Sequence, residues 1–401
     1  MKTQRTIAAL LLPVLIFALS ALPAQADDAL PTSKVVAQGA ILMDFETGRV
    51  LWEKNAHEPL PMASTTKIMT AILTLEKGDL NDIVTISANA AHTPEVNMNL
   101  TTGEKIKLEN LLYALMLQSS NDSAVAIAEY IGGSVEEFCR MMTAKAKEIG
   151  AKDTVFETPN GLDKGDHHST AYDMALIARY AMKNPEFIKI INTQGVSAES
   201  DKKSYVITNK NRLLYEYEGA NGIKTGFTGK AGHCFVGAAK RGDMQLISVV
   251  LASGWGDKGK AQKWVDTKAM LNYGFQNYQY YTVFNRGDEA GSVTVNRSKT
   301  PSVRYYYAEG LRLPLTKTEK ENLRVAEDVP SQMLAPVQKG QKLGDATVLV
   351  CNTAFAQIPL IAEDSAARHD LKSSIEKLLN VWFEMGTDGD VSITLPENIL
   401  P

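Results

Sequence analysis

A serine and a lysine stand three residues apart at the start of a helical pattern, in the run Met62-Ala63-Ser64-Thr65-Thr66-Lys67-Ile68. Residues at i and i+3 share one helix face, so we expect the Ser64 hydroxyl and the Lys67 amine to lie close together. A lysine that is desolvated beside another cation has a lowered pKa and is then able to take the serine proton. Backbone N–H groups at the helix start would stabilise a developing oxyanion. The spacing alone also fits a capped helix with a surface lysine.

Two further polar clusters make the capped-helix interpretation untenable. Ser119-Ser120-Asn121 falls between two helical patterns, where a serine hydroxyl would relay a proton and an asparagine amide would hold a substrate amide. Lys224-Thr225-Gly226 falls in a predicted strand that small residues leave open to a ligand. There the lysine would polarise the site, the threonine would bind a carboxylate, and the glycine would allow close approach of the backbone.

The trio Ser-x-x-Lys, Ser-x-Asn and Lys-Thr-Gly is typical of class A β-lactamases and penicillin-binding proteins. From about Val35 to Leu379 the chain resembles the D-alanyl-D-alanine carboxypeptidases, the low-molecular-mass penicillin-binding proteins of peptidase family S11. The resemblance extends to the segments 160–163, 169–175 and 209–214. It implies that Ser64 is the acylated nucleophile, that Lys67 is its base, and that Ser119 and Lys224 relay protons. It also implies that the substrate is bound by Asn121, Thr225, Gly226, Phe227 and Lys210. No metal or cofactor is expected, because the three cysteines are too few and too far apart for a zinc site.

Three positions depart from the pattern of the family. Phe227 stands where members often carry histidine, Lys210 where some carry arginine, and Gln245 where some carry a second arginine. Lysine offers a point charge where arginine offers a bidentate fork, so these departures concern the grip on the terminal carboxylate. The oxyanion hole implied by the resemblance uses the backbone N–H groups of Ser64 and Phe227.

The resemblance predicts a serine carboxypeptidase that removes the terminal D-alanine from peptidoglycan pentapeptide stems and is acylated by β-lactams as covalent inhibitors. A class A-like β-lactamase would need a Glu-x-x-Leu-Asn segment between the second and third motifs, and Glu157-Thr158-Pro159-Asn160 has the wrong spacing and a proline. A transpeptidase stays open because only the acceptor differs. A non-enzymatic protein that docks cell-wall partners is disfavoured, since all three motifs are intact.

Other reactive residue types fit these roles less well. His57, His167 and His168 occur without a His-x-x-x-His or Gly-x-Ser-x-Gly pattern, so we interpret them as solvated loop residues. Asp173 is expected to cap the next helix. The three cysteines, Cys139, Cys234 and Cys351, lie in apolar stretches and are expected to be buried.

The elements that must position these residues follow a strand, helix, strand order. Two strands are predicted within 35–53, helices within 68–75, 108–117, 124–131, 135–149 and 172–182, and strands again at 222–227, 234–239 and 244–251. A closing helix is expected at 258–278. This order predicts an α+β serine β-lactamase/transpeptidase-like domain at 27–279, with an antiparallel sheet that joins both ends of the domain. Short β-branched and aromatic runs then predict a small all-β domain at 280–365.

Composition and charge restrict the classes of partner. The 401 residues are 44% hydrophobic and 22% charged, as in folded soluble proteins. A formal net charge of −4 lacks the basic excess that nucleic-acid binding normally needs.

The two ends of the chain carry targeting patterns. Residues 1–26 read as a signal peptide, with Lys2 and Arg5 before an apolar run and Ala24-Gln25-Ala26 as the cleavage site. We therefore expect export to the cell envelope, either to the periplasm or to the outer face of the cytoplasmic membrane. A helix at 366–385, followed by a tail at 386–401, has an apolar face that would either pack on the β domain or make weak contact with a membrane surface.

Overall fold

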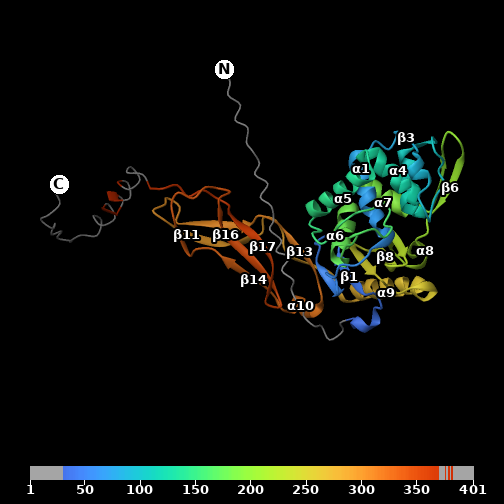
Figure 1. Ribbon diagram of the computed structural model, residues 1–401. Coiled ribbons are helices and arrows are strands. Elements are labelled where there is room, and N and C mark those ends of the chain that lie inside the picture. Colours follow the sequence, from blue (N-terminus) through green and yellow to red (C-terminus); the bar gives the residue numbers. More distant parts are fainter. Residues whose placement is uncertain (1–29, 370–374, 376–377, 380, 383–401) are drawn as a thin grey trace, which may run out of the picture. The chain divides into compact units, whose positions relative to one another are not determined.

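The computed structural model describes residues 30–369, 375, 378, 379, 381 and 382 (Figure 1). The described chain forms two compact units. The N-terminal unit runs to Tyr280 and includes Pro314–Lys317; the C-terminal unit comprises Tyr281–Leu313 and the residues from Thr318 on. The predicted signal peptide at 1–26 lies outside the described residues.

A five-stranded antiparallel sheet forms the centre of the N-terminal unit, with the strand order β2-β1-β9-β8-β7. Its strands are β1 (Gly39–Asp44), β2 (Val50–Lys54), β7 (Ala220–Thr228), β8 (Gly232–Arg241) and β9 (Met244–Leu251). Strand β1 pairs with β9, so the start and the end of the unit share one sheet, as expected from the sequence. Strand β7 is an edge strand, which leaves one side of it open.

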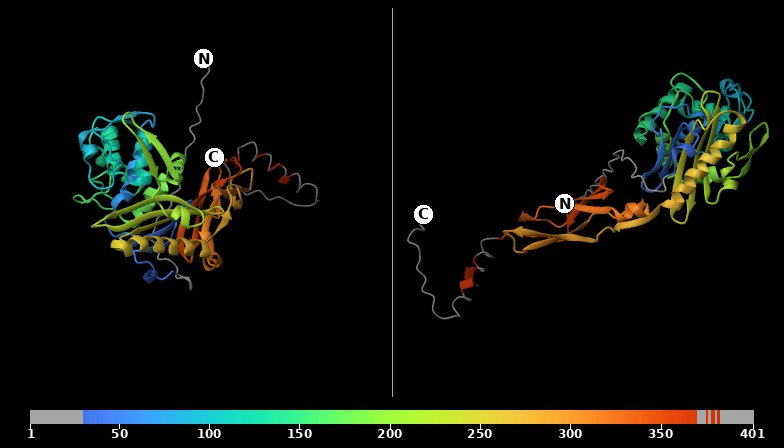
Figure 2. Two further views of the ribbon diagram at one scale, coloured as in Figure 1. Left: turned by 90° about the vertical axis from the view of Figure 1, so that its right-hand side faces the viewer. Right: turned by 90° about the horizontal axis from the view of Figure 1, so that it is seen from below.

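The sheet is buried on both faces because alternate residues of each strand enter two different cores. Ile41 and Val236 belong to a core formed with the helical layer, whereas Leu42 and Phe235 belong to a core formed with α9 (Gly256–Asn277). This alternation follows from the two-residue period of a strand. Helix α9 accordingly lies on the opposite side of the sheet from the other long helices (Figure 2).

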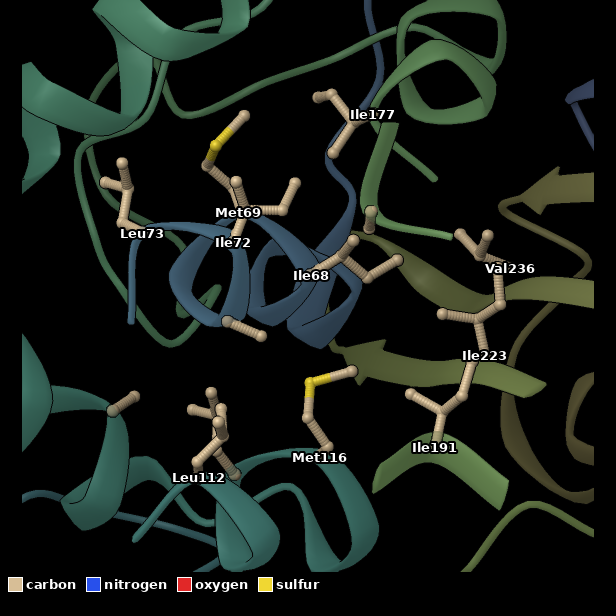
Figure 3. Packing of buried hydrophobic residues seen from close by; sticks show 14 of the residues in the cluster. Ile68, Met69, Ile72, Leu73, Leu112, Met116, Ile177, Ile191, Ile223 and Val236 are labelled. Carbon is tan, nitrogen blue, oxygen red and sulfur yellow. The ribbon is translucent and has the colours of Figure 1, made fainter. Parts of the chain in front are cut away.

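Helix α1 (Lys67–Lys77) lies at the centre of the helical layer and positions the site. Its side chains Ile68, Met69, Ile72 and Leu73 are buried among residues of neighbouring helices and of β7 and β8 (Figure 3). Full burial of each aliphatic side chain contributes about 1.5–3 kcal/mol, so this helix is held firmly. The other helices of the unit are α2 (Ala88–Ala91), α3 (Leu108–Tyr113), α4 (Asn121–Gly132), α5 (Val135–Ile149), α6 (Ala171–Ala181), α7 (Pro185–Asn192) and α8 (Leu213–Glu216).

Two small hairpins and three short helices of this unit, α2, α7 and α8, were not predicted. The hairpins are β3 (Ile83–Thr85) with β4 (Lys105–Lys107), and β5 (Gly195–Glu199) with β6 (Ser204–Thr208). Only Ala198 and Ile207 are buried in the second hairpin, so its hydrophobic pattern is weak. Helix α7 carried a readable signal, because Asn184 caps it and Pro185 takes its first position.

The C-terminal unit contains a six-stranded sheet with the order β14-β16-β17-β12-β11-β15, in which β11 and β15 are parallel. Its strands are β11 (Glu289–Asn296), β12 (Ser302–Tyr307), β14 (Leu323–Asp328), β15 (Gln332–Leu334), β16 (Lys342–Val350) and β17 (Thr353–Ala362). The segments at the boundary of the two units form β10 (Gln279–Phe284), β13 (Leu311–Leu315) and the short helix α10 (Lys317–Glu321). The predicted β-rich composition is thus confirmed.

The C-terminal helix was predicted to begin at residue 366, which is too early. Ala366 is buried and pairs with Val337, and Arg368 pairs with Ser298, so residues 366–368 extend the β structure. Most of the remaining helix lies outside the described residues. Residues 375, 378, 379, 381 and 382 are described as helical, and the side chains Ile375, Leu378, Leu379, Val381 and Trp382 are exposed. Among the described residues, no helix is both long and apolar enough to cross a bilayer.

Candidate active site

Ser64 lies in a 3₁₀ turn, Ala63–Thr66, that leads directly into α1, and Lys67 is the first residue of that helix. Lys67 Nζ lies 2.9 Å from Ser64 Oγ. Ala63 at the start of the turn has a φ of +48°, a conformation that non-glycine residues rarely adopt. The turn places the Ser64 side chain, which is half-buried, over the amine of Lys67.

The amine of Lys67 is enclosed by three oxygen atoms. Besides Ser64 Oγ, it contacts Asn121 Oδ1 at 2.8 Å and the backbone oxygen of Asn160 at 2.6 Å. The side chain is fully buried. Burial holds the pKa of Lys67 well below its ordinary value, and the positive charge of Lys224 lowers it further. The structure thus provides a lysine that is biased toward its neutral form beside a serine hydroxyl.

The second motif follows a π-helical segment, Ala114–Gln118, where a single helix had been predicted over 108–117. Ser119 has a left-handed backbone with a φ of +70°, and α4 then begins at Asn121. This break turns the chain so that Asn121 Oδ1 meets Lys67 while Asn121 Nδ2 donates to the oxygen of Pro94 at 3.0 Å. π-Helical turns of this kind are frequent at functional sites.

The third motif lies on the edge strand β7, where Lys224 is buried and Thr225 is half-buried. Lys224 Nζ donates to the oxygen of Thr225 at 3.0 Å. Burial, together with the charges of Lys210 and Lys263, lowers the pKa of Lys224 to about 7. A Cβ atom on Gly226 would lie 3.0 Å from the backbone nitrogen of Ser64, so only glycine fits here without displacement.

The remaining predicted binding residues lie around this centre without touching it. Phe227 is 47% exposed and its ring lies 4.4 Å from that of His233. Lys210 is exposed, and its backbone N–H donates to the oxygen of Leu117. Gln245 is buried and pairs with Asn221, so its amide is occupied by another side chain. Among the described residues, no hydrogen bond joins Ser119, Thr225 or Lys210 to Ser64 or Lys67.

One group of the site, the backbone oxygen of Asn160, was not predicted from the sequence. The oxygen of Asn160 accepts from Lys67, and Gly161 has a φ of +86° and packs against Ala63, where a Cβ atom would collide with the backbone. The Asn-Gly pair was a readable turn signal, but nothing in its type indicates that a main-chain oxygen would reach the lysine.

Three other expectations are wrong. His167 is buried. Glu157 N donates to its Nδ1, and its Nε2 lies 2.9 Å from Thr66 Oγ1. Asp173 does not cap α6; Thr170 does, while the buried Asp173 carboxylate accepts from Asp153 N and Thr154 Oγ1. Cys351 is only half-buried, unlike Cys139 and Cys234.

Comparison with known proteins agrees with this geometry. Residues 24–254 match the family described as D-alanyl-D-alanine carboxypeptidase, peptidase S11, and residues 278–368 match the C-terminal domain of penicillin-binding protein 5. The chain belongs to the peptidase S11 D-alanyl-D-alanine carboxypeptidases. It is therefore a serine-type hydrolase with an α+β penicillin-binding fold and a C-terminal β domain.

Relatives of this carboxypeptidase extend over nearly its whole length. It is 32% identical over 391 residues to the D-alanyl-D-alanine carboxypeptidase DacF of Bacillus subtilis. The aligned region covers 94% of this chain and 99% of the relative. Penicillin-binding protein 5 of Haemophilus influenzae has a TM-score of 0.73 at 28% identity, over 85% of this chain and 99% of that one. A variant of the Streptomyces K15 DD-transpeptidase has a TM-score of 0.57 at 33% identity, over 60% of this chain and 98% of that one.

Proposed function

We propose that this carboxypeptidase removes the terminal D-alanine from peptidoglycan pentapeptide stems through an acyl-enzyme at Ser64. The observation that carries the proposal is the set of three contacts around Lys67 Nζ. A neutral amine has two N–H groups and one lone pair. When the N–H groups are donated to Asn121 Oδ1 and the oxygen of Asn160, the lone pair is left for the Ser64 hydroxyl, and Lys67 is poised as a general base.

The proposed oxyanion hole consists of the backbone N–H groups of Ser64 and Phe227. Gly226 supports it, because the absence of a side chain lets β7 approach the nitrogen of Ser64. Preorganised N–H donors stabilise the charge that develops on the scissile carbonyl oxygen. Ser119 and Lys224 would relay the proton from Lys67 to the leaving D-alanine. Asn121, which lies beside Lys67, would contact the substrate amide.

The terminal carboxylate of the stem would be bound by the cationic end of the site. Thr225 supplies a half-buried hydroxyl next to Lys224, and the exposed amine of Lys210 lies near enough to lower the pKa of Lys224. A β-lactam carries a strained amide and a carboxylate in the same relation, so we propose that it acylates Ser64 covalently.

Transpeptidation is the second candidate, because a solved relative is the Streptomyces K15 DD-transpeptidase. The two reactions share the acyl-enzyme and differ only in whether water or an amine attacks it. D-Alanine release from a peptide that ends in D-Ala-D-Ala, followed with increasing amine acceptor, separates them. Hydrolysis predicts free shortened peptide at every acceptor concentration, whereas product joined to the acceptor would establish transpeptidation.

We further propose export through a signal peptide at 1–26, a catalytic domain at 27–279 and a β domain at 280–365. The apolar residues Leu378, Leu379 and Trp382 are exposed, which supports weak contact of the C-terminal segment with a membrane surface. Hydrolysis of stem peptides requires export, since peptidoglycan lies outside the cytoplasmic membrane.

A further inference from the structure

One acidic residue of the loop beside the site, Glu95, has an unusual backbone. Its φ is +69°, in the left-handed region that costs non-glycine residues free energy. Two hydrogen bonds from Asn121 hold its neighbours: Asn121 Nδ2 donates to the oxygen of Pro94 at 3.0 Å, and Asn121 N donates to the oxygen of Val96 at 2.7 Å. Glu95 is therefore fixed from both sides by the residue that contacts Lys67.

Hydrogen bonds also fix the continuation of the loop at Met98 and Leu100. The carboxylate of Asp122, buried at the start of α4, accepts from the backbone N–H groups of Met98 and Leu100, each at 3.1 Å. These contacts over-determine the backbone, which is the condition under which a strained conformation persists. Strain that is maintained in this way beside an active site is commonly part of its function.

The Glu95 carboxylate is accessible to a ligand. The residue is exposed, and no described residue forms a hydrogen bond or an ion pair with its side chain. The pKa of Lys67 is lowered chiefly by burial and then by Lys224, but the negative charge of Glu95 opposes that shift. The carboxylate thus acts on the site from its rim, whereas Lys210 and Lys224 make another part of the site cationic.

We propose that Glu95 is a specificity residue that binds an ammonium group on the stem peptide, the free amine of a diamino acid at the third position. This inference rests on the proposed function. A peptide acylated at Ser64 places its penultimate residue at the nucleophile, and an extended chain advances about 3.5 Å per residue, so the third residue emerges at the rim. Glu95 would attract its amine and repel the terminal carboxylate, which orients the peptide.

The test compares two peptides that differ only in that charge, Nα-acetyl-L-lysyl-D-alanyl-D-alanine and its Nε-acetylated form. The wild-type protein is expected to prefer the free amine by about two- to five-fold in kcat/KM at low salt, and to lose the preference as salt screens the pair. Glu95→Gln should reduce the ratio to about one through KM, and Glu95→Asp should restore part of it. Glu58→Gln, a change of another exposed carboxylate in the same unit, is the matched control.

The same variants separate this inference from the proposed function. Glu95→Gln has nearly the same shape as the wild-type side chain, and covalent labelling of its Ser64 by penicillin shows that the variant is folded. Equal loss on both peptides, slower deacylation of the penicilloyl-enzyme, or a wild-type protein indifferent to the amine would overturn the specificity role while the carboxypeptidase activity stands. Release of D-alanine from neither peptide would overturn both.

Discussion

The backbone nitrogen of Ser64 lies where a methyl group on Gly226 would approach to 3.0 Å. The edge strand β7 thus packs directly against the turn that carries the nucleophile. This contact joins two motifs that are 160 positions apart in the sequence, and it sets the distance between the two proposed oxyanion donors.

Gly226→Ala should therefore slow acylation of Ser64 by about 10- to 100-fold, because the added methyl displaces the oxyanion donors by a few tenths of an ångström. The rate is measured from penicilloyl-enzyme formation by mass spectrometry. Gly229→Ala is the matched control, since its Cβ would meet no atom within 4 Å. An unchanged rate in Gly226→Ala would remove Gly226 from the site.

Lys67→Ala should slow acylation by about 10²- to 10⁴-fold, which is the usual contribution of a positioned general base. Lys77→Ala, a change of an exposed lysine on the same helix, should leave the rate unchanged. Circular dichroism and thermal unfolding establish that both variants are folded. Near-normal acylation of Lys67→Ala would mean that another group takes the serine proton.

His167 makes a distinct prediction about stability. Burial lowers its pKa from an ordinary 6.5 to about 4, so the unfolded chain binds more protons than the folded protein between these two pH values. The free energy of unfolding should therefore fall by about 3 kcal/mol through this residue as the pH drops from above 6.5 to 4. Urea unfolding at several pH values should show a smaller fall in His167→Gln than in wild type or in His57→Gln. Parallel curves for all three would contradict the buried, neutral histidine.

The sequence predicted the three motifs and the elements that carry them, because each has its own local pattern. Helix α1 is buried at every position from Lys67 to Thr74, and β8 is buried at every position from Gly232 to Ala239, so apolar runs in the sequence mark both elements. The participation of Asn160 was not predictable, since any residue type supplies a backbone oxygen. The burial of His167 was missed for a similar reason: its partners, Thr66 and the N–H of Glu157, come together only in the folded chain.

The C-terminal segment leads to a prediction about membranes. The full-length mature protein should float with liposomes in part and with little dependence on salt, because the contact would be made by exposed apolar side chains, and the three basic residues of 366–385 are balanced by three acidic ones. A version that ends at His369 retains the pairing of Ala366 with Val337 and should not float. Equal flotation of the two, or none for the longer protein, would mean that the segment packs against the protein itself and does not bind the membrane.

The most direct test of the account is the intact mass of the protein after incubation with benzylpenicillin, followed by peptide mapping. The account predicts that one molecule of penicillin adds covalently, that the label lies on Ser64, and that Ser64→Ala takes up none. An unlabelled Ser64 in the folded wild-type protein, or equal labelling of Ser64→Ala, would contradict it.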